Sequence, residues 1–152
     1  MLKWLSLSAL VFALDQASKW LVFTGMEYRD MIELLPFFSL VHARNTGAAF
    51  SFLADAGGWQ RWLFLGIGFV ASLIILHLLK KHHSERLMAG GLALILGGAI
   101  GNVFDRIWHG FVVDFLYFHY QAFSFPAFNI ADSAITIGAA LLIFDSLRRK
   151  PA

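Results

Sequence analysis

The sequence predicts an all-α membrane protein with four transmembrane helices and a small interfacial β element. Hydrophobic residues make up 59% of the 152 residues and charged residues only 14%, whereas a typical soluble domain has about 25% charged residues. Mean hydropathy is +0.67. Four stretches also reach the length of about 20 mostly apolar residues that a helix needs to cross a bilayer. We therefore expect a single integral membrane domain over residues 1–152.

The four expected transmembrane helices are Leu5–Phe23, Trp62–Leu79, Leu87–Phe104 and Ile130–Leu147. Two long connections, Thr24–Arg61 and Asp105–Asn129, lie between them. The first stretch follows Lys3 in the manner of a cleaved signal peptide. The charged Asp15 and Lys19 within it, and the three spans that follow, favour a helix that is retained.

Basic residues gather at one set of helix ends. Seven of the twelve lie there: Lys3, Lys80, Lys81, Arg86, Arg148, Arg149 and Lys150. The positive-inside rule makes this side cytoplasmic, together with both termini, so the two long connections face outward. The absence of cysteine excludes disulfides and thiolate catalysis. A net charge of +2 gives no support for a nucleic-acid partner.

Two aspartates lie in strongly apolar surroundings. Asp114 is in the segment Phe111–Tyr117 and Asp132 is in Phe128–Ala134. An ionised carboxylate in such surroundings costs several kcal/mol unless it is paired. The topology brings both to the outer surface, where two carboxylates that meet can share one proton and act as base and acid together. This pattern predicts an intramembrane aspartic protease, in which the pair activates a water molecule against an amide.

The third expected span has small residues every four positions, which is typical of a helix-packing face. These residues are Ala89, Ala93, Gly97 and Gly101. Polar residues follow them directly: Asn102, Asp105 and Arg106. Two interpretations stay open for the polar group. It could cap the helix through a local Asp105–Arg106 ion pair, or it could orient the two aspartates or the scissile peptide.

Two further features each allow two interpretations. Asp15 and Lys19 are four positions apart and share a helical face, so they form either a self-neutralising ion pair or part of the site. Phe38–Arg44 is compatible with a short strand, followed by turn residues at Asn45–Gly47. That strand could bind a substrate peptide by strand addition, or it could belong to an ordinary interfacial hairpin.

Other classes of function receive less support. The sequence has no H-E-x-x-H motif, no Gly-x-Ser-x-Gly motif and no Gly-rich phosphate loop, so we expect neither a metal nor an organic cofactor. A small transporter or proton-relay subunit would also use intramembrane carboxylates, but it predicts carboxylates spread across membrane depth. A purely structural membrane adaptor leaves the cost of two buried aspartates unexplained.

Five blocks of sequence, in order, resemble the bacterial lipoprotein signal peptidase (signal peptidase II) family over essentially the whole chain. They are Asp15-Gln-Ala-Ser-Lys19, Asn45-Thr-Gly-Ala-Ala-Phe-Ser51, Gly101-Asn-Val-Phe-Asp-Arg106, Val112-Val-Asp-Phe115 and Phe128-Asn-Ile-Ala-Asp132. The resemblance implies that Asp114 and Asp132 are catalytic. It also implies a set of polar residues around the substrate: Asp15, Lys19, Asn45, Gly47, Asn102, Asp105, Arg106 and Asn129.

The resemblance further implies a substrate and a location. The substrate would be a prolipoprotein whose cysteine already carries a diacylglyceryl group, cleaved just before that cysteine. The first outer connection would form a small extracytoplasmic β-sheet on the membrane, with a mobile element over the cleft that globomycin-type inhibitors occupy. We expect a multi-pass monomer in the bacterial cytoplasmic (inner) membrane, in contact with membrane lipid, with its site near the periplasmic face.

Overall fold

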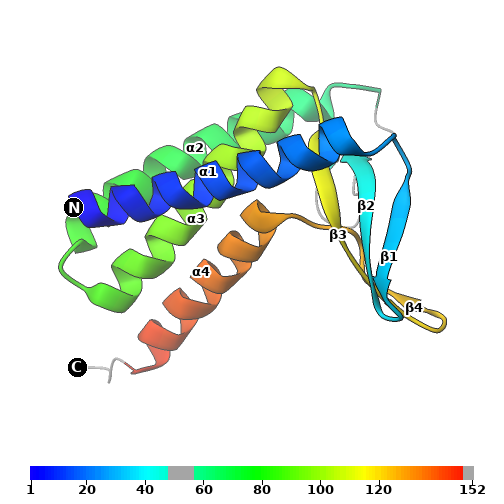
Figure 1. Ribbon diagram of the computed structural model, residues 1–152. Coiled ribbons are helices and arrows are strands. Elements are labelled where there is room, and N and C mark those ends of the chain that lie inside the picture. The colour runs from blue at the N-terminus through cyan, green and yellow to red at the C-terminus, as the bar shows by residue number, and fades with distance from the viewer. Residues whose placement is uncertain (48–56, 149–152) are drawn as a thin grey trace.

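The computed structural model describes residues 1–47 and 57–148, and within them the chain forms four long helices and a small antiparallel sheet (Figure 1). The elements are α1 (Leu2–Gly25), β1 (Met31–Leu35), β2 (Phe38–Asn45), α2 (Gln60–His82), α3 (Arg86–Trp108), β3 (Val112–Tyr120), β4 (Phe123–Ser124) and α4 (Ile130–Arg148). The small antiparallel sheet confirms the predicted β element beside the helices. Positions 48–51 of the second sequence block, Arg149 and Lys150 lie outside the described residues.

Three of the described helices are long and apolar enough to cross a membrane: α2, α3 and α4. The sequence predicted four such spans. Helix α1 is equally long, but Asp15, Gln16 and Lys19 interrupt its apolar sequence. Hydropathy alone therefore supports three spans among the described residues.

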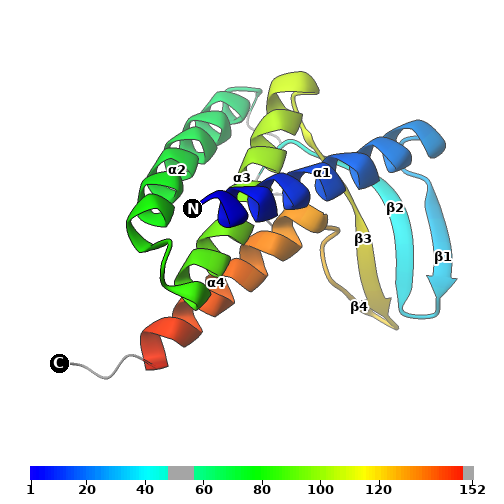
Figure 2. The same cartoon turned by 60° about the vertical axis from the view of Figure 1, so that its left-hand side comes forward.

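Helix α3 lies at the centre of the helical bundle and packs against each of the other three helices (Figure 2). Its predicted small-residue face is confirmed as a packing face. A Cβ on Gly97 would lie 2.6 Å from the carbonyl oxygen of Ser8 in α1, so only glycine allows this approach. The sequence analysis missed a second such face. Gly91 of α3 meets Gly138 of α4, where an added Cβ would lie 2.8 Å from a carbonyl oxygen.

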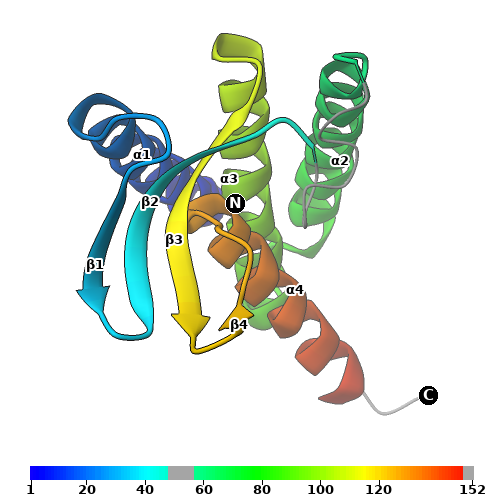
Figure 3. The ribbon, with the colours of Figure 1, turned by 90° about the vertical axis from the view of Figure 1, so that its right-hand side faces the viewer.

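The sheet has the order β1-β2-β3-β4, with every neighbouring pair antiparallel (Figure 3). The predicted strand at Phe38–Arg44 corresponds to β2, which forms a hairpin with β1 and also pairs with β3. The hairpin interpretation is therefore confirmed. The alternative, that this strand adds a substrate peptide along a free edge, is wrong because β2 is an interior strand.

Strand β3 attaches the sheet to α1 and turns Asp114 to the face opposite that contact. Val113 and Phe115 are buried against Val22 near the end of α1. Because successive side chains of a strand point to opposite faces, Asp114 faces the other side of the sheet. Asp114 was expected in the connection Asp105–Asn129, and its place in a strand of that connection gives the carboxylate a fixed direction.

Candidate active site

A cavity of about 760 Å³ lies where the sheet meets the C-terminal end of α3 and the N-terminal half of α4. Asp114 reaches it from β3, and Asp132 reaches it from the first turn of α4. The other residues lining this cavity are Ala43, Arg44, Asn45, Asn102, Arg106, Val112, Phe125, Pro126, Ala127, Phe128, Ser133, Ile135, Thr136 and Ile137. The fold thus brings the two predicted aspartates to one cavity from elements of different kinds.

Asn129 joins the two aspartates directly. It immediately precedes α4, and its Oδ1 accepts a hydrogen bond of 2.9 Å from the backbone N–H of Asp132. This contact caps the helix, because the first N–H groups of a helix have no partner within it. The Nδ2 of the same amide donates to Asp114 Oδ1 at 2.7 Å. One fully buried side chain therefore fixes the start of α4 and the carboxylate of Asp114 together.

Asn45 holds the other oxygen of Asp114. Its Oδ1 accepts a hydrogen bond from the backbone N–H of Gly47, which leaves Nδ2 to donate to Asp114 Oδ2 at 3.0 Å. The β2–β3 register makes this contact possible, since Asn45 pairs with Val112, two residues before Asp114 on the same face. Gly47 contributes its backbone, because its carbonyl oxygen accepts a hydrogen bond of 2.7 Å from Arg106 Nη2.

Asn102 and Arg106 extend from the last turns of α3 into the cavity wall. Asn102 Nδ2 donates to Asp132 Oδ1 at 2.8 Å. Arg106 lies over the ring of Phe64, 5.3 Å from its centroid, and its Nη1 donates to the carbonyl oxygen of Asn102. These contacts favour the interpretation in which the polar residues of α3 orient the aspartates.

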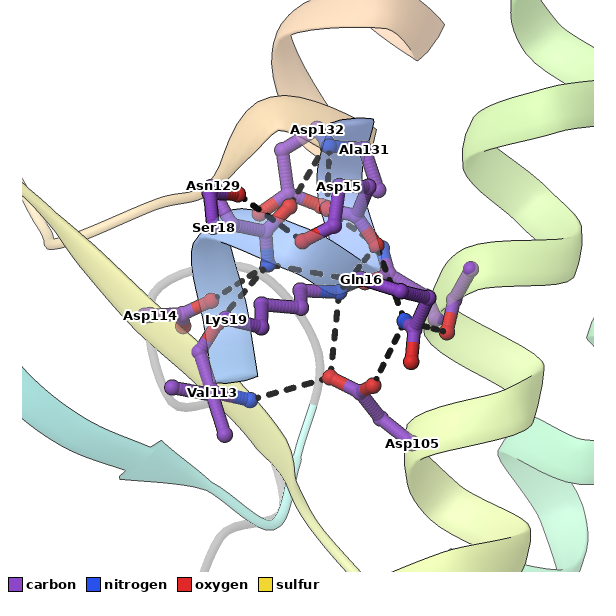
Figure 4. A network of polar contacts seen from close by, with 12 residues as sticks. Asp15, Gln16, Ser18, Lys19, Asp105, Val113, Asp114, Asn129, Ala131 and Asp132 are labelled. Atoms are coloured by element: carbon purple, nitrogen blue, oxygen red, sulfur yellow. Dashed lines mark hydrogen bonds and ion pairs between the residues drawn. The ribbon is translucent and has the colours of Figure 1, made fainter. Parts of the chain in front are cut away.

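Asp15, Lys19 and Asp105 form a buried charged cluster behind the cavity (Figure 4). Lys19 Nζ lies 2.8 Å from Asp15 Oδ2 and 3.0 Å from Asp105 Oδ2. The predicted Asp15–Lys19 pair is confirmed. The interpretation of Asp105 and Arg106 as a local ion pair is wrong, because α3 continues to Trp108 and turns Asp105 toward Lys19. None of the three residues of the charged cluster lines the cavity.

The charged cluster binds the backbone next to Asp114 and Asp132, which are called the dyad aspartates from here on. Asp105 Oδ2 accepts a hydrogen bond from the N–H of Val113, and Asp15 Oδ1 accepts one from the N–H of Ala131. Each of these N–H groups belongs to the residue that immediately precedes a dyad aspartate (Figure 4). The cluster therefore fixes the chain beside Asp114 and Asp132 without touching their carboxylates.

Gln16 completes the cluster, and the sequence analysis assigned it no role. Its Nε2 donates to Asp105 Oδ1 at 2.9 Å and to Asp15 Oδ2 at 3.1 Å. The available signal was its place in the first sequence block, between Asp15 and Lys19. Its amide therefore supplies a donor to Asp105 Oδ1, while the ammonium of Lys19 contacts the other oxygen of that carboxylate.

The surroundings of Asp114 change its acidity. Burial, and after it the nearby charge of Asp132, raise the pKa of Asp114 from 3.8 to about 7. Hydrogen bonds from Asn45 and Asn129 oppose this rise in pKa, because both amides donate to the charged form. Asp114 is therefore suited to hold a proton near neutral pH.

Known proteins are similar to this chain over most of its length. The sequence model of signal peptidase (SPase) II matches residues 7–148, which is nearly the whole chain. The chain belongs to the signal peptidase II family. A protein of Burkholderia thailandensis named lipoprotein signal peptidase is 56% identical over 146 residues, covering 96% of this chain and 88% of the relative. A protein of Paraburkholderia phymatum with the same name is 54% identical over the same length.

Two solved structures have the same fold as this member of the signal peptidase II family. Both are titled as bacterial membrane enzyme structures determined by the in meso method, one at 2.3 Å and one at 1.9 Å resolution. The first is 29% identical with a TM-score of 0.88 and covers 100% of this chain and 94% of its own. The second is 31% identical with a TM-score of 0.78, covering 99% and 96%.

The apolar part of the cavity wall was not predicted. Phe125, Pro126 and Ala127, with Ile135, Thr136 and Ile137 of α4, line the cavity and lie outside the five sequence blocks. This member of the signal peptidase II family is so hydrophobic that residue type alone does not distinguish apolar residues that line a cavity from those that face lipid. Only the fold separates the two groups.

Proposed function

We propose that the chain is an aspartic endopeptidase that removes signal peptides from diacylglyceryl-modified prolipoproteins in the bacterial cytoplasmic membrane. The observation that carries this proposal is that Asp114 and Asp132 line one cavity and are joined through Asn129. The family membership supports the same reaction, because the named relatives are lipoprotein signal peptidases. It disfavours the alternative of a transporter or proton-relay subunit.

In the proposed mechanism, Asp114 holds the shared proton and Asp132 is ionised. Asp132 takes a proton from a water molecule, whose oxygen forms a bond to the carbonyl carbon before the lipid-modified cysteine. Asp114 polarises the carbonyl oxygen by donating its proton. Collapse of the tetrahedral intermediate breaks the C–N bond: the proton held by Asp132 goes to the leaving amine, and a hydroxyl of the intermediate returns a proton to Asp114 as the new carboxyl group forms. The raised pKa of Asp114 supports this division of roles.

The supporting residues have three proposed roles. Asn45 and Asn129 orient Asp114, while Asn102 orients Asp132. Arg106 and the backbone of Gly47 bind the substrate peptide at the cavity wall. The charged cluster of Asp15, Lys19 and Asp105 fixes the backbone beside both aspartates, so it acts on the site from behind and not through contact with substrate.

We also propose that α1 crosses the membrane, which gives four spans. Its charged residues are turned inward: Asp15 has no exposed surface and Lys19 only 3%. Residues on its other faces, such as Leu10, Leu14 and Leu21, are exposed and apolar. A hydropathy average counts the buried charges, although lipid would contact only the apolar side.

The proposed orientation places both termini in the cytoplasm and the cavity near the periplasmic face. The N-terminus, the α2–α3 link and the end of α4 lie together at one end of the bundle, and the sheet lies at the other (Figure 1). The first group includes Lys3, Lys80, Lys81 and Arg86, as the positive-inside rule requires of the cytoplasmic side. Acyl chains of the substrate could remain in lipid beside Ile135 and Ile137, at the apolar wall of the cavity.

The test is a cleavage assay with purified protein in lipid nanodiscs. A prolipoprotein carrying the diacylglyceryl group should yield a shortened product that begins at the lipidated cysteine, and the same precursor without lipid should not. A globomycin-type cyclic peptide should inhibit the reaction, and mass measurement of the particles should give one copy of the chain. An intact lipidated precursor after prolonged incubation would contradict the assignment.

A further inference from the structure

Arg61, in the first turn of α2, caps the C-terminal end of α3. Its Nε donates to the carbonyl oxygen of Arg106 at 2.8 Å, and its Nη2 donates to that of Ile107 at 3.0 Å. The last carbonyl groups of a helix receive no hydrogen bond from an N–H within the helix, and they carry partial negative charge. A guanidinium from a neighbouring helix satisfies two of these carbonyls and complements their charge.

The cap contacts Arg106 through its backbone carbonyl group. The side chain of Arg106 donates to the carbonyl oxygens of Asn102 and Gly47 and lines the cavity. Arg106 is therefore attached at both ends, by Arg61 at its carbonyl group and by Gly47 at its guanidinium. This arrangement links the start of α2, the end of α3 and the end of β2 through one residue.

The turn after α3 packs against the cap. Gly110 adopts a φ of +85°, a conformation that favours glycine. A Cβ at this position would lie 3.4 Å from Arg61 Nη1, which is ordinary van der Waals distance, so the guanidinium packs directly against this turn. The two hydrogen bonds of the cap and this packing together define the contact that the arginine makes. Lysine cannot reproduce it, because an ammonium is a single donor centre and lacks the fork of a guanidinium.

We propose that Arg61 is a positioning residue for the peptidase reaction, which holds the last turn of α3 so that Arg106 presents its guanidinium to the substrate. The inference rests on the proposed function, since it assigns Arg106 to the substrate peptide. Arg61 itself does not line the cavity. Its effect on catalysis must therefore pass through Arg106.

A double-mutant cycle tests this route. Arg61→Gln should lower kcat/KM for the lipidated precursor about tenfold, mostly through KM, since it removes two charge-assisted hydrogen bonds behind a binding group. In an Arg106→Lys background, where the fork of Arg106 is already absent, the same change should cost less than about twofold. Arg148→Gln, an exposed arginine at the other end of the bundle, is the matched control and should leave both parameters unchanged. Equal fold losses in the two backgrounds would overturn the proposal.

Hydrogen exchange supplies a readout that does not depend on the reaction. Arg61→Gln should speed amide exchange in a peptide covering the last turn of α3, Arg61→Lys should have an intermediate effect, and Arg148→Gln should have none. Unchanged exchange would show that the cap does not hold the helix end, and would also overturn the proposal. If Arg61→Gln does not fold, Arg61→Lys takes its place in the cycle. Failure of the wild-type chain to cleave would count against the proposed function. Hydrogen exchange would still show whether Arg61 holds the last turn of α3.

Discussion

Lys19 Nζ lies 3.0 Å from Asn102 Oδ1 and thereby determines which end of that amide faces Asp132. An ammonium can only donate, so the amide oxygen faces Lys19 and the nitrogen donates to Asp132 Oδ1. Backbone N–H groups fix the amides of Asn45 and Asn129 in the same way. The three amides that orient the dyad therefore have defined directions, each set by a donor that cannot reverse its role.

Replacing Lys19 should be strongly destabilising. Lys19→Met leaves Asp15 and Asp105 buried without their cation, and uncompensated buried charges of this kind cost about 3–5 kcal/mol. Thermal unfolding in detergent should show a clear loss of stability. Adding Asp105→Asn should recover part of it by removing one of the unpaired charges. Equal unfolding temperatures for the wild type and Lys19→Met would contradict a structural role for the cluster.

Neutralising either dyad aspartate should abolish cleavage without preventing folding. Asp114→Asn removes the proposed acid and Asp132→Asn the proposed base, and groups of this kind typically contribute about 10²–10⁴-fold to the rate. Initial rates with a lipidated precursor and unfolding temperatures should be measured together. Asp145→Asn, toward the other end of α4, is the control and should keep full activity. Near-normal cleavage by either dyad variant would remove the proposed mechanism.

The rate should fall on the alkaline side with an apparent pKa near 7. Below this value Asp114 is protonated and can donate, and above it the carboxyl ionises and the acid is lost. Asn45→Ala should lower the rate and also move the alkaline limb to higher pH. The reason is that Asn45 donates to the ionised form, so its removal raises the pKa of Asp114 further. If the alkaline limb of the pH–rate profile moved to lower pH in this variant, Asn45 would raise the pKa of Asp114 and not lower it, which would contradict the prediction.

Two glycine-to-alanine substitutions distinguish the effect of a close helix–helix contact on stability from the effect of helix propensity. In α3, a Cβ on Gly98 would overlap the carbonyl oxygen of Ala131 in α4, whereas a Cβ on Gly66 in α2 meets nothing within 4 Å. Gly98→Ala should displace the first turn of α4, lowering both thermal stability and cleavage rate. Gly66→Ala should leave both intact, since alanine is the better helix former. Similar behaviour of the two variants would contradict a tight α3–α4 contact.

The catalytic candidates could be found from sequence because they conflict with their surroundings. Asp114 and Asp132 are charged residues within apolar segments, and that conflict is visible without a structure. The Asp15–Lys19 pair was accessible for another reason, since helical spacing alone places the two residues on one face.

Strand β3 and Arg61 were harder to predict, for different reasons. The first four residues of β3 are all buried, so the alternation that marks a half-exposed strand is absent where it matters. The role of Arg61 depends on two carbonyl groups 45 and 46 positions away along the chain. Contacts to backbone carbonyls leave no mark in the sequence of the residues that accept them.

The charged cluster also bears on how the chain is made. Lys19 and Asp15 are neighbours on α1, which is synthesised before α3 and α4, so each charge already has a partner when this helix meets the lipid. Asp105 joins them only after α3 has been made, and the two N–H groups that the cluster holds arrive later still, with β3 and α4. The supporting charged cluster therefore begins to form before the segments that carry Asp114 and Asp132 have been synthesised. A nascent or truncated chain that lacks α4 has one dyad carboxylate and cannot hydrolyse neighbouring proteins in the membrane by the proposed mechanism.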